Sequence, residues 1–327
     1  MRAPEFWRCD GPLPRLLAPL AWGYDLAGRS RRQLVRPRRA SVPVICVGNL
    51  VAGGAGKTPT ALAVAERLAP QGCEVHFLTR GYGGGVRGPH RVDPARDDVR
   101  SVGDEALLLA AAAPTWVSPD RIAGARAATA AGAGALVMDD GFQNPGLVKD
   151  LALVVVDAGY GFGNRRVLPA GPLRETVARG LDRADAVALV GEDDGAADLE
   201  AEIAARGMTI LRGRLEPAAA GQRLVGRRVV AFAGIARPDR LFTMLDAIGC
   251  RLVARHAFAD HHRYTPDEIM RLVEQASAAD AVPVTTAKDY VRLSEEARPM
   301  VEALDVRLVW RDAAVLDRLL APLFAAG

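Results

Sequence analysis

The sequence VPVICVGNLVAGGAGKT, residues 42–58, decides the fold. It opens with a short apolar run, rich in β-branched residues, that ends in glycines. A helical pattern then runs from Thr60 to Leu68. An apolar run that is bounded by glycines and followed by a helical pattern predicts a strand, a loop and a helix in that order.

The same alternation continues along the chain. Apolar strands that are separated by helices indicate a parallel sheet covered by helices on both faces. Before residue 192 we expect strands at 74–79, 135–138 and 151–156, and a helix at 105–113. After residue 227 we expect strands at 228–233, 252–258, 282–286 and 306–310, and helices at 238–248, 266–278 and from 313 onward.

The middle of the chain interrupts this pattern. Between residues 192 and 226 the sequence becomes acidic, alanine-rich and glycine-rich, so we place a domain boundary near residue 221. The predicted parts are an N-terminal segment, 1–40, a doubly wound α/β domain, 41–221, and a smaller α/β domain, 222–327.

The composition excludes several classes of protein. The 42 Lys and Arg residues nearly balance the 39 Asp and Glu residues, which gives no reason to expect nucleic-acid binding. The four cysteines form no CxxC pair, which argues for a reducing compartment and against a zinc or disulfide framework. No apolar run approaches the roughly 18 to 20 residues needed to cross a bilayer, and charges interrupt the N-terminus where a signal peptide would be apolar. We expect the protein in the cytosol.

The N-terminal segment has two possible roles. Leucines and aromatic residues recur at helical spacing between residues 12 and 34, and six arginines lie between 29 and 39. Such a stretch can lie in the headgroup layer of a membrane and attract anionic lipid. The alternative is a helix packed on its own domain and followed by a solvated basic loop.

The loop that follows the first strand predicts nucleotide binding. Glycines in the stretch Gly53-Gly54-Ala55-Gly56-Lys57-Thr58 allow backbone N–H groups to surround phosphate oxygens. Lys57 can reach the outer phosphates and the Thr58 hydroxyl can bind magnesium. The usual motif has a glycine at the position of Val51, and the alternative is a glycine-rich turn that binds no nucleotide. We include Val51 and Ala52 with residues 53–58 in the predicted nucleotide site, and the fold is predicted to be P-loop NTPase-like.

Two carboxylates follow a neighbouring strand. The run 135–138 ends at Asp139 and Asp140, at the edge where doubly wound sheets bind ligands. Mg²⁺ prefers oxygen ligands and usually keeps several waters, so one or two carboxylates with Thr58 and a nucleotide are sufficient. A solvated turn rich in Asp and Gly is the alternative.

Two more loops at this edge carry polar residues. Arg80 and Tyr82 lie in the flexible stretch 79–85, where a guanidinium and a phenol suit a phosphate or a sugar. Asp104 precedes the predicted helix 105–113, and local sequence favours a helix N-cap there over a catalytic role.

Taken together, these residues resemble the tetraacyldisaccharide 4′-kinase family, the lipid A kinases of Gram-negative bacteria. The matching motifs run in family order over most of the chain. They are VGNLVAGGAGKTP (47–59), TRGYGG (79–84), VGDE (102–105), MDDGFQN (138–144), LPAGPLRE (168–175), FADHH (258–262) and TTAKD (285–289). The family's phosphate loop also lacks the first glycine, so Val51 fits it.

The resemblance implies an ATP- and Mg²⁺-dependent transfer of the γ-phosphate to the 4′-hydroxyl of a tetraacylated glucosamine disaccharide 1-phosphate, which gives lipid IVA. It also implies a glycolipid substrate and attachment, through the N-terminal helix, to the cytoplasmic face of the inner membrane and its anionic surface. No obligate protein partner is implied. A rival hypothesis is a membrane-associated P-loop ATPase switch of the partitioning or sorting type. Such a switch usually carries a lysine at the start of the loop, where this chain has Val51 and Ala52, and it would not need a catalytic pair of Asp104 and His261.

The resemblance also implies roles for individual residues. Asp104 is expected to be the catalytic base, paired with a histidine of the second domain that approaches across a cleft. The FADH pattern selects His261 over His262. The remaining expectations are Lys57 as a catalytic phosphate ligand, Thr58, Asp139, Asp140 and Glu105 at magnesium, and Arg80, Tyr82, Gln143 and Arg174 at the glycolipid headgroup. Lys288, in TTAKD, has no role that we can derive.

Overall fold

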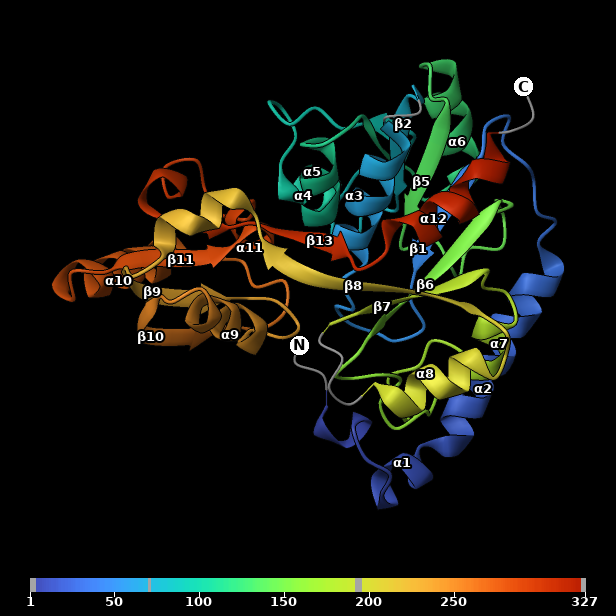
Figure 1. Ribbon diagram of the computed structural model, residues 1–327, viewed down its shortest axis with the longest axis horizontal. Coiled ribbons are helices and arrows are strands. Elements are labelled where there is room, and N and C mark those ends of the chain that lie inside the picture. Colours follow the sequence, from blue (N-terminus) through green and yellow to red (C-terminus); the bar gives the residue numbers. More distant parts are fainter. Residues whose placement is uncertain (1–3, 70–71, 192–195, 325–327) are drawn as a thin grey trace. The chain divides into compact units, whose positions relative to one another are not determined.

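The protein is described by a computed structural model over residues 4–69, 72–191 and 196–324 (Figure 1). The described chain divides into two compact units. The larger unit consists of the residues up to Leu215 together with those from Leu308 onward, and the smaller unit is Glu216–Arg307. Strands β8 and β13 each contain one of the points at which the chain passes from one unit to the other.

The larger unit is built on a mostly parallel sheet. Within the described residues this sheet has nine strands, in the order β13-β8-β7-β6-β1-β5-β2-β4-β3. The strand bounds are β1 Val44–Gly48, β2 Val75–Thr79, β3 His90–Arg91, β4 Thr115–Val117, β5 Ala135–Asp139, β6 Leu151–Asp157, β7 Ala186–Val190, β8 Thr209–Pro217 and β13 Val306–Trp310. Only the short β3 is shown to run antiparallel, against β4. Every residue of β1, β5 and β6 is buried, as expected for central strands with both faces covered.

Helices cover this sheet. Their bounds are α1 Pro12–Leu16, α2 Ala18–Leu34, α3 Lys57–Leu68, α4 Val99–Val102, α5 Asp104–Ala110, α6 Arg121–Ala130, α7 Val177–Leu181, α8 Ala197–Ala204 and α12 Ala313–Leu320. Helix α3 packs against β1 and β5, and α6 packs against β2 and β4. Because β1 pairs in parallel with β5, the loop before α3 and the residues after β5 emerge at the same edge of the sheet.

The smaller unit repeats the α/β design with a four-stranded parallel sheet in its described residues, in the order β10-β9-β11-β12. Its elements are β9 Arg228–Ala233, α9 Asp239–Ala247, β10 Arg251–Ala257, α10 Pro266–Ala278, β11 Val282–Thr286, α11 Ala287–Tyr290 and β12 Glu302–Leu304. Alternate residues of β9 belong to two core clusters. Val229 packs in the cluster that includes α9, and Phe232 packs in the cluster that includes α10. Helices therefore cover both faces of this sheet as well.

The predicted fold class, a doubly wound parallel α/β sheet with a smaller α/β domain and an N-terminal helix, is confirmed. The two units do not coincide with the predicted segments 1–40, 41–221 and 222–327, because residues 4–40 also belong to the larger unit. Residues from Leu308 to 324 return to the larger unit because Leu316 and Leu320 of α12 are fully buried in its core. The loosened stretch after residue 192 also contains α8 and the long strand β8, whose arginines and glycines concealed the strand pattern.

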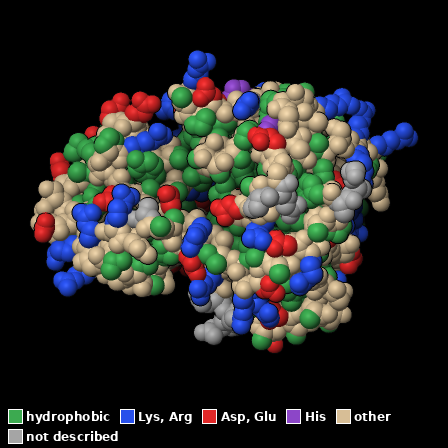
Figure 2. Space-filling view, turned by 45° about the horizontal axis from the view of Figure 1, so that its top comes forward, with side chains coloured by type: hydrophobic (Ala, Val, Ile, Leu, Met, Phe, Trp, Pro, Cys, Tyr) green, Lys and Arg blue, Asp and Glu red, His purple; other side chains and the backbone are tan. Residues whose placement is uncertain are grey.

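The surface is mixed in charge, and no helix among the described residues is long and apolar enough to cross a bilayer. Figure 2 shows basic and acidic side chains interspersed on the face in view, in keeping with the near balance of 42 basic and 39 acidic residues. The predicted stretch 12–34 forms two helices, α1 and α2, in place of one.

Candidate functional site

The loop between β1 and α3 has the backbone of a phosphate-binding loop. Gly53 and Gly56 have φ values of 121° and 88°, in the region that side-chain-bearing residues avoid. The Asn49 side chain donates to the Gly53 carbonyl at 3.3 Å, which ties the start of the loop to its middle. Gly56 is the N-cap of α3, so the amides at the start of this helix are presented to the loop.

Residues 172–174 form backbone hydrogen bonds with this loop. Ala52 N–H donates to the Pro172 carbonyl at 2.7 Å, and Arg174 N–H donates to the Leu50 carbonyl at 2.8 Å. Val51 forms a β-bridge with Leu173 and is only 6% exposed. The position at which the usual motif has glycine is therefore a paired, buried valine, and the motif LPAGPLRE supplies the pairing strand.

Lys57 and Thr58 face the two carboxylates at the end of β5. The Thr58 hydroxyl donates to Asp139 Oδ2 at 3.0 Å, and Lys57 Nζ lies 3.8 Å from Asp140 Oδ1. Lys57 is 8% exposed and Asp139 is fully buried. The structure thus brings together Lys57 and Thr58 at the start of α3 and Asp139 and Asp140 at the end of β5, four of the residues predicted for phosphate and magnesium.

Asp139 is arranged to accept a cation. Its Oδ1 atom is buried and has no hydrogen-bond partner in the structure. Burial and the negative charge of Glu105 raise the pKa of Asp139 to about 7, although Lys57 and the Thr58 hydrogen bond act in the opposite sense. Among the described residues no cluster of three or more His, Cys, Asp and Glu side chains could hold a metal ion by itself. These donors fit Mg²⁺, which takes few protein ligands and completes its shell with phosphate and water.

Asp140 has a different environment from its neighbour. Its φ of 51° is uncommon for a residue with a side chain, and it turns the carboxylate toward Arg174, which donates to both oxygens at 2.8 and 3.2 Å. Burial alone would raise the pKa of Asp140, but Lys57 and Arg174 outweigh it and lower that pKa to about 2. Near neutral pH Asp140 is therefore ionised, whereas Asp139 is divided between its protonated and ionised forms.

Gln143 and Glu175 extend this network. Gln143 donates to the Asn49 carbonyl at 2.9 Å and to Glu175 Oε1 at 3.3 Å, and its own Oε1 accepts from Arg174 at 3.2 Å. Glu175, which is 1% exposed, also binds Arg183 at 2.5 Å and Arg32 of α2 at 3.2 Å. Sequence reasoning assigned no role to Glu175, and it counted Arg32 only among the six arginines expected to attract anionic lipid. The available signal was the charged pair Arg174-Glu175 at the end of an otherwise apolar motif.

The loops that carry Arg80 and Asp104 pack against each other. Gly85 N–H donates to the Ser101 carbonyl at 2.9 Å, and a Cβ on Gly103 would lie 2.4 Å from the Tyr82 carbonyl oxygen. The Arg80 side chain is exposed, and Tyr82 is 65% exposed. Both candidate headgroup residues are therefore accessible on a loop that glycines hold close to the start of α5.

Asp104 is the first residue of α5 and is 2% exposed. The N-cap of this helix is Gly103, so the capping role that local sequence favoured for Asp104 is wrong. Gly103 has a φ of 86°, which a residue with a side chain would adopt only under strain, and this φ leaves Asp104 inside the helix. Asp104 Oδ1 accepts from Glu105 N–H at 2.9 Å.

His261 belongs to the smaller unit. The backbone N–H of His261 donates to the Gly234 carbonyl at 3.0 Å, and the φ of 57° places this residue at a tight turn. His262 has structural contacts instead: its ring stacks on Phe258 with centroids 4.8 Å apart, and its Nε2 lies 3.1 Å from Glu268 Oε2. These contacts favour His261 as the functional histidine. Because Asp104 lies in the larger unit, its pairing with His261 stays a prediction.

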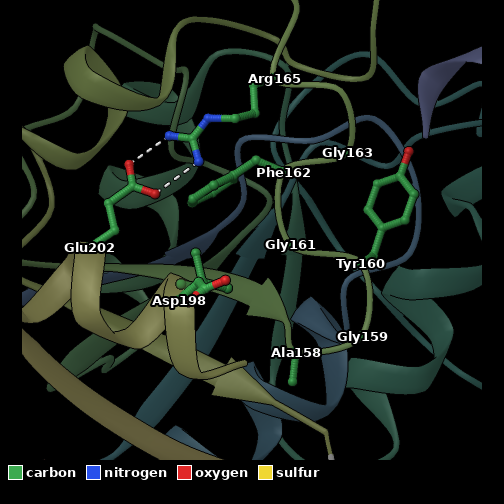
Figure 3. Close-up of a pocket in the computed structure, with 10 residues that line it drawn as sticks. Ala158, Gly159, Tyr160, Gly161, Phe162, Gly163, Arg165, Asp198 and Glu202 are labelled. Carbon is green, nitrogen blue, oxygen red and sulfur yellow. Dashed lines mark hydrogen bonds and ion pairs between the residues drawn. The ribbon is translucent and has the colours of Figure 1, made fainter. Parts of the chain in front are cut away.

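A pocket of about 290 Å³ lies away from these residues, between the loop after β6 and helix α8 (Figure 3). Arg165 and Glu202 join at its rim through hydrogen bonds of 2.8 and 2.6 Å. None of the sequence-predicted site residues is among the described residues that line it. The pocket is not part of the candidate site.

Comparison with known proteins places this chain in a family. The family model described as tetraacyldisaccharide-1-P 4′-kinase matches residues 13–324. A tetraacyldisaccharide 4′-kinase from Rhodospirillum centenum is 56% identical over 333 residues, covering 99% of this chain and 97% of the relative. One from Rhodospirillum rubrum is 53% identical over 328 residues, covering 98% of each. A crystal structure of LpxK from Aquifex aeolicus in complex with ATP matches with a TM-score of 0.77 and 26% identity, covering 96% of this chain and 100% of that chain.

The raised pKa of Asp139 predicts a pH-dependent effect of Asp139→Asn on stability. Between about pH 4 and pH 7 an acid whose folded-state pKa is raised holds its proton more tightly in the folded chain, so its contribution to the free energy of unfolding decreases as pH rises. At about pH 8, Asp139→Asn should therefore be more stable than wild type, by on the order of 1 to 3 kcal/mol. Near pH 4 the two should be similar. Denaturant unfolding of both nucleotide-free proteins at the two pH values measures the difference in their free energies of unfolding. The same difference at both pH values would contradict the raised pKa of Asp139.

Proposed function

The chain belongs to the tetraacyldisaccharide-1-P 4′-kinase family, and from this membership we propose how the residues at the edge of β1 and β5 carry out its reaction. It is an ATP-dependent kinase of lipid A biosynthesis, which phosphorylates the 4′-hydroxyl of the tetraacyldisaccharide. The observation that carries the proposal is the contact of Thr58 with Asp139 beside Lys57, at the start of α3. The comparisons give no support to an ATPase switch.

The nucleotide is proposed to lie over the loop 51–58. Its phosphates would accept hydrogen bonds from the loop amides and lie beside the Lys57 ammonium, at the positive end of α3. Thr58, Asp139, Asp140 and Glu105 are the residues proposed to hold Mg²⁺, directly or through water. The ion, when bound, neutralises charge on the phosphates. Phosphoryl transfer depends mainly on such alignment and charge neutralisation.

Asp104 is proposed as the base of the reaction. The sugar 4′-oxygen attacks the γ-phosphorus, the bond from that phosphorus to the β,γ-bridging oxygen breaks, ADP leaves, and the hydroxyl proton passes to the Asp104 carboxylate. The burial of Asp104 supports this role because a base that is shielded from water can be oriented by its surroundings. His261 is proposed to orient that carboxylate, with domain motion bringing the two together.

The glycolipid headgroup is proposed to contact Arg80, Tyr82, Gln143 and Arg174. Arg80 and Tyr82 are exposed, so they can approach an anionic sugar phosphate directly. Arg174 and Gln143 are bound to Asp140 and to the Asn49 carbonyl in this structure. In this arrangement their contact with the headgroup would be made next to the Asp140 carboxylate that Arg174 already binds.

The N-terminal helices are proposed to lie in the cytoplasmic surface of the inner membrane. Leu16 and Leu20 are 76% and 63% exposed, and Trp22 is 68% exposed. Other residues fix α2 to the larger unit: Asp25 is 6% exposed and binds Arg179, and Arg32 binds Glu175. The two interpretations of this segment are compatible, because one set of side chains packs on the domain while another set is available to lipid.

Replacing the proposed base and its histidine tests the reaction. Asp104→Ala and His261→Ala should each lower kcat for transfer from labelled ATP to the disaccharide lipid, Asp104→Ala by about 100-fold or more. ATP binding should be unchanged, since neither residue belongs to the phosphate loop. His256→Ala, a partly exposed histidine of the smaller unit, serves as the control. If both variants fold and turn over at the wild-type rate, the assignment is wrong.

Removing the exposed leucines tests membrane contact. Leu16→Ser with Leu20→Ser should weaken sedimentation with anionic vesicles at least about tenfold, because each buried leucine contributes roughly 1.5 to 3 kcal/mol. Val225→Ser, at an apolar residue of the smaller unit that is 56% exposed, should have no effect. Unchanged vesicle binding of the double variant would exclude this surface.

A further inference from the structure

The motif TTAKD has no role in the reaction as described so far, yet its aspartate organises the smaller unit's polar core. Asp289 is fully buried. Its Oδ1 accepts from Gly234 N–H and from the Tyr264 hydroxyl, each at 3.0 Å, and its Oδ2 accepts from the Thr286 hydroxyl at 2.7 Å. A Cβ at Gly234 would lie 3.0 Å from Asp289 Oδ1, so glycine permits this approach.

Asp289 also holds a buried arginine. Arg292, whose side chain is 3% exposed, donates from Nη1 to Asp289 Oδ1 at 2.7 Å and to the Gly234 carbonyl at 2.8 Å. These contacts fix the plane of the guanidinium. The other terminal nitrogen, Nη2, is then directed at the ring of His261, 3.3 Å from Nδ1.

The chemistry of this contact decides where the histidine proton lies. A guanidinium can only donate hydrogen bonds, so Nδ1 of His261 must accept, and the proton of the neutral ring belongs on Nε2. The backbone supports the same orientation, because His261 N–H donates to the same Gly234 carbonyl that accepts from Arg292. Asp260 Oδ1 lies 3.9 Å from Nε2, beyond hydrogen-bond distance.

We infer that Arg292, held by Asp289, is a positioning residue that fixes the Nε2–H tautomer of His261. This inference rests on the proposed role of His261 as the partner of Asp104. A ring with its proton on Nε2 can donate to a carboxylate and leave the other carboxylate oxygen to accept the proton of the sugar hydroxyl. The opposite tautomer would present a lone pair to the carboxylate and repel it. The TTAKD motif and Arg292 thus act on the reaction through His261.

The direct test is the tautomer of His261 in the full-length wild-type chain. With ¹⁵N-labelled histidine, NMR reads both ring nitrogens at a pH well above the ordinary imidazole range. The chain has five histidines, and His261→Gln identifies the signal. Nδ1 should show the shift of an unprotonated ring nitrogen and Nε2 that of a protonated one. A proton on Nδ1 would overturn the inference.

Variants of Arg292 test whether this residue sets the tautomer of His261. Arg292→Leu should populate the Nδ1–H tautomer and lower kcat about tenfold, with the KM for ATP unchanged. Arg292→Lys, whose side chain also only donates, should keep a larger Nε2–H population and a higher kcat than Arg292→Leu. Arg298→Leu is the control, because that guanidinium donates to the Val291 carbonyl at 3.1 Å. A folded Arg292→Leu that keeps a pure Nε2–H tautomer contradicts the inference. If this variant does not fold because Asp289 loses its partner, Arg292→Lys and the wild-type spectrum decide.

The two proposals fail separately. Normal turnover of His261→Ala together with an Nε2–H ring in wild type would remove His261 from the reaction and would support the role of Arg292 in setting the tautomer. Loss of turnover in His261→Ala together with an Nδ1–H ring would support the catalytic role and overturn the role of Arg292.

Discussion

A buried carboxylate at the end of a central strand is the constraint on which this structure depends. Asp139 is fully buried, and an ionised group in that position is costly unless it is paired. The parallel pairing of β1 with β5 provides the partner, since it places Thr58 at the start of α3 within 3.0 Å of Asp139. Lys57 lies beside Asp140 for the same reason. The residues proposed to bind phosphate and cation thus meet because two adjacent strands end at one edge.

Neighbouring residues hold the loop before α3 and the carboxylate of Asp140 in place. The segment 172–174 pairs with the loop residues 50–52, and Arg174 holds Asp140 by two hydrogen bonds. Behind it, Glu175 joins Gln143 to Arg32 of α2. Helix α2, whose exposed leucines are proposed to contact lipid, is therefore joined by the Arg32–Glu175 ion pair to residues that contact the loop before α3. If α2 lies in the membrane surface as proposed, this ion pair connects that surface to the loop before α3.

The sequence predicted the contacts that adjacent strands produce, and it did not predict those that depend on the path of loops. Thr58 and Asp139 could be paired in advance because a strand, a glycine loop and a second strand ending in carboxylates imply a common edge. The Glu175 contact with Arg32 joins residues far apart in the chain, and no local pattern indicates it. Gly103 took the cap that Asp104 was expected to provide, because the backbone before α5 adopts a positive φ. The contact of Arg292 with His261 was not predicted, because it depends on the turn that places His261 beside Gly234 at the end of β9.

The claim that Lys57 lies at the terminal phosphate of ATP is central, and one measurement tests it most directly. The chain has only three lysines, Lys57, Lys149 and Lys288. A Mg²⁺-bound ATP analogue that carries a reactive acyl group on its γ-phosphate should transfer that group to Lys57, as read by peptide mass spectrometry, and excess ATP should suppress the transfer. Acylation of Lys149 or Lys288 with Lys57 unmodified, or acylation that ATP does not suppress, would contradict the account.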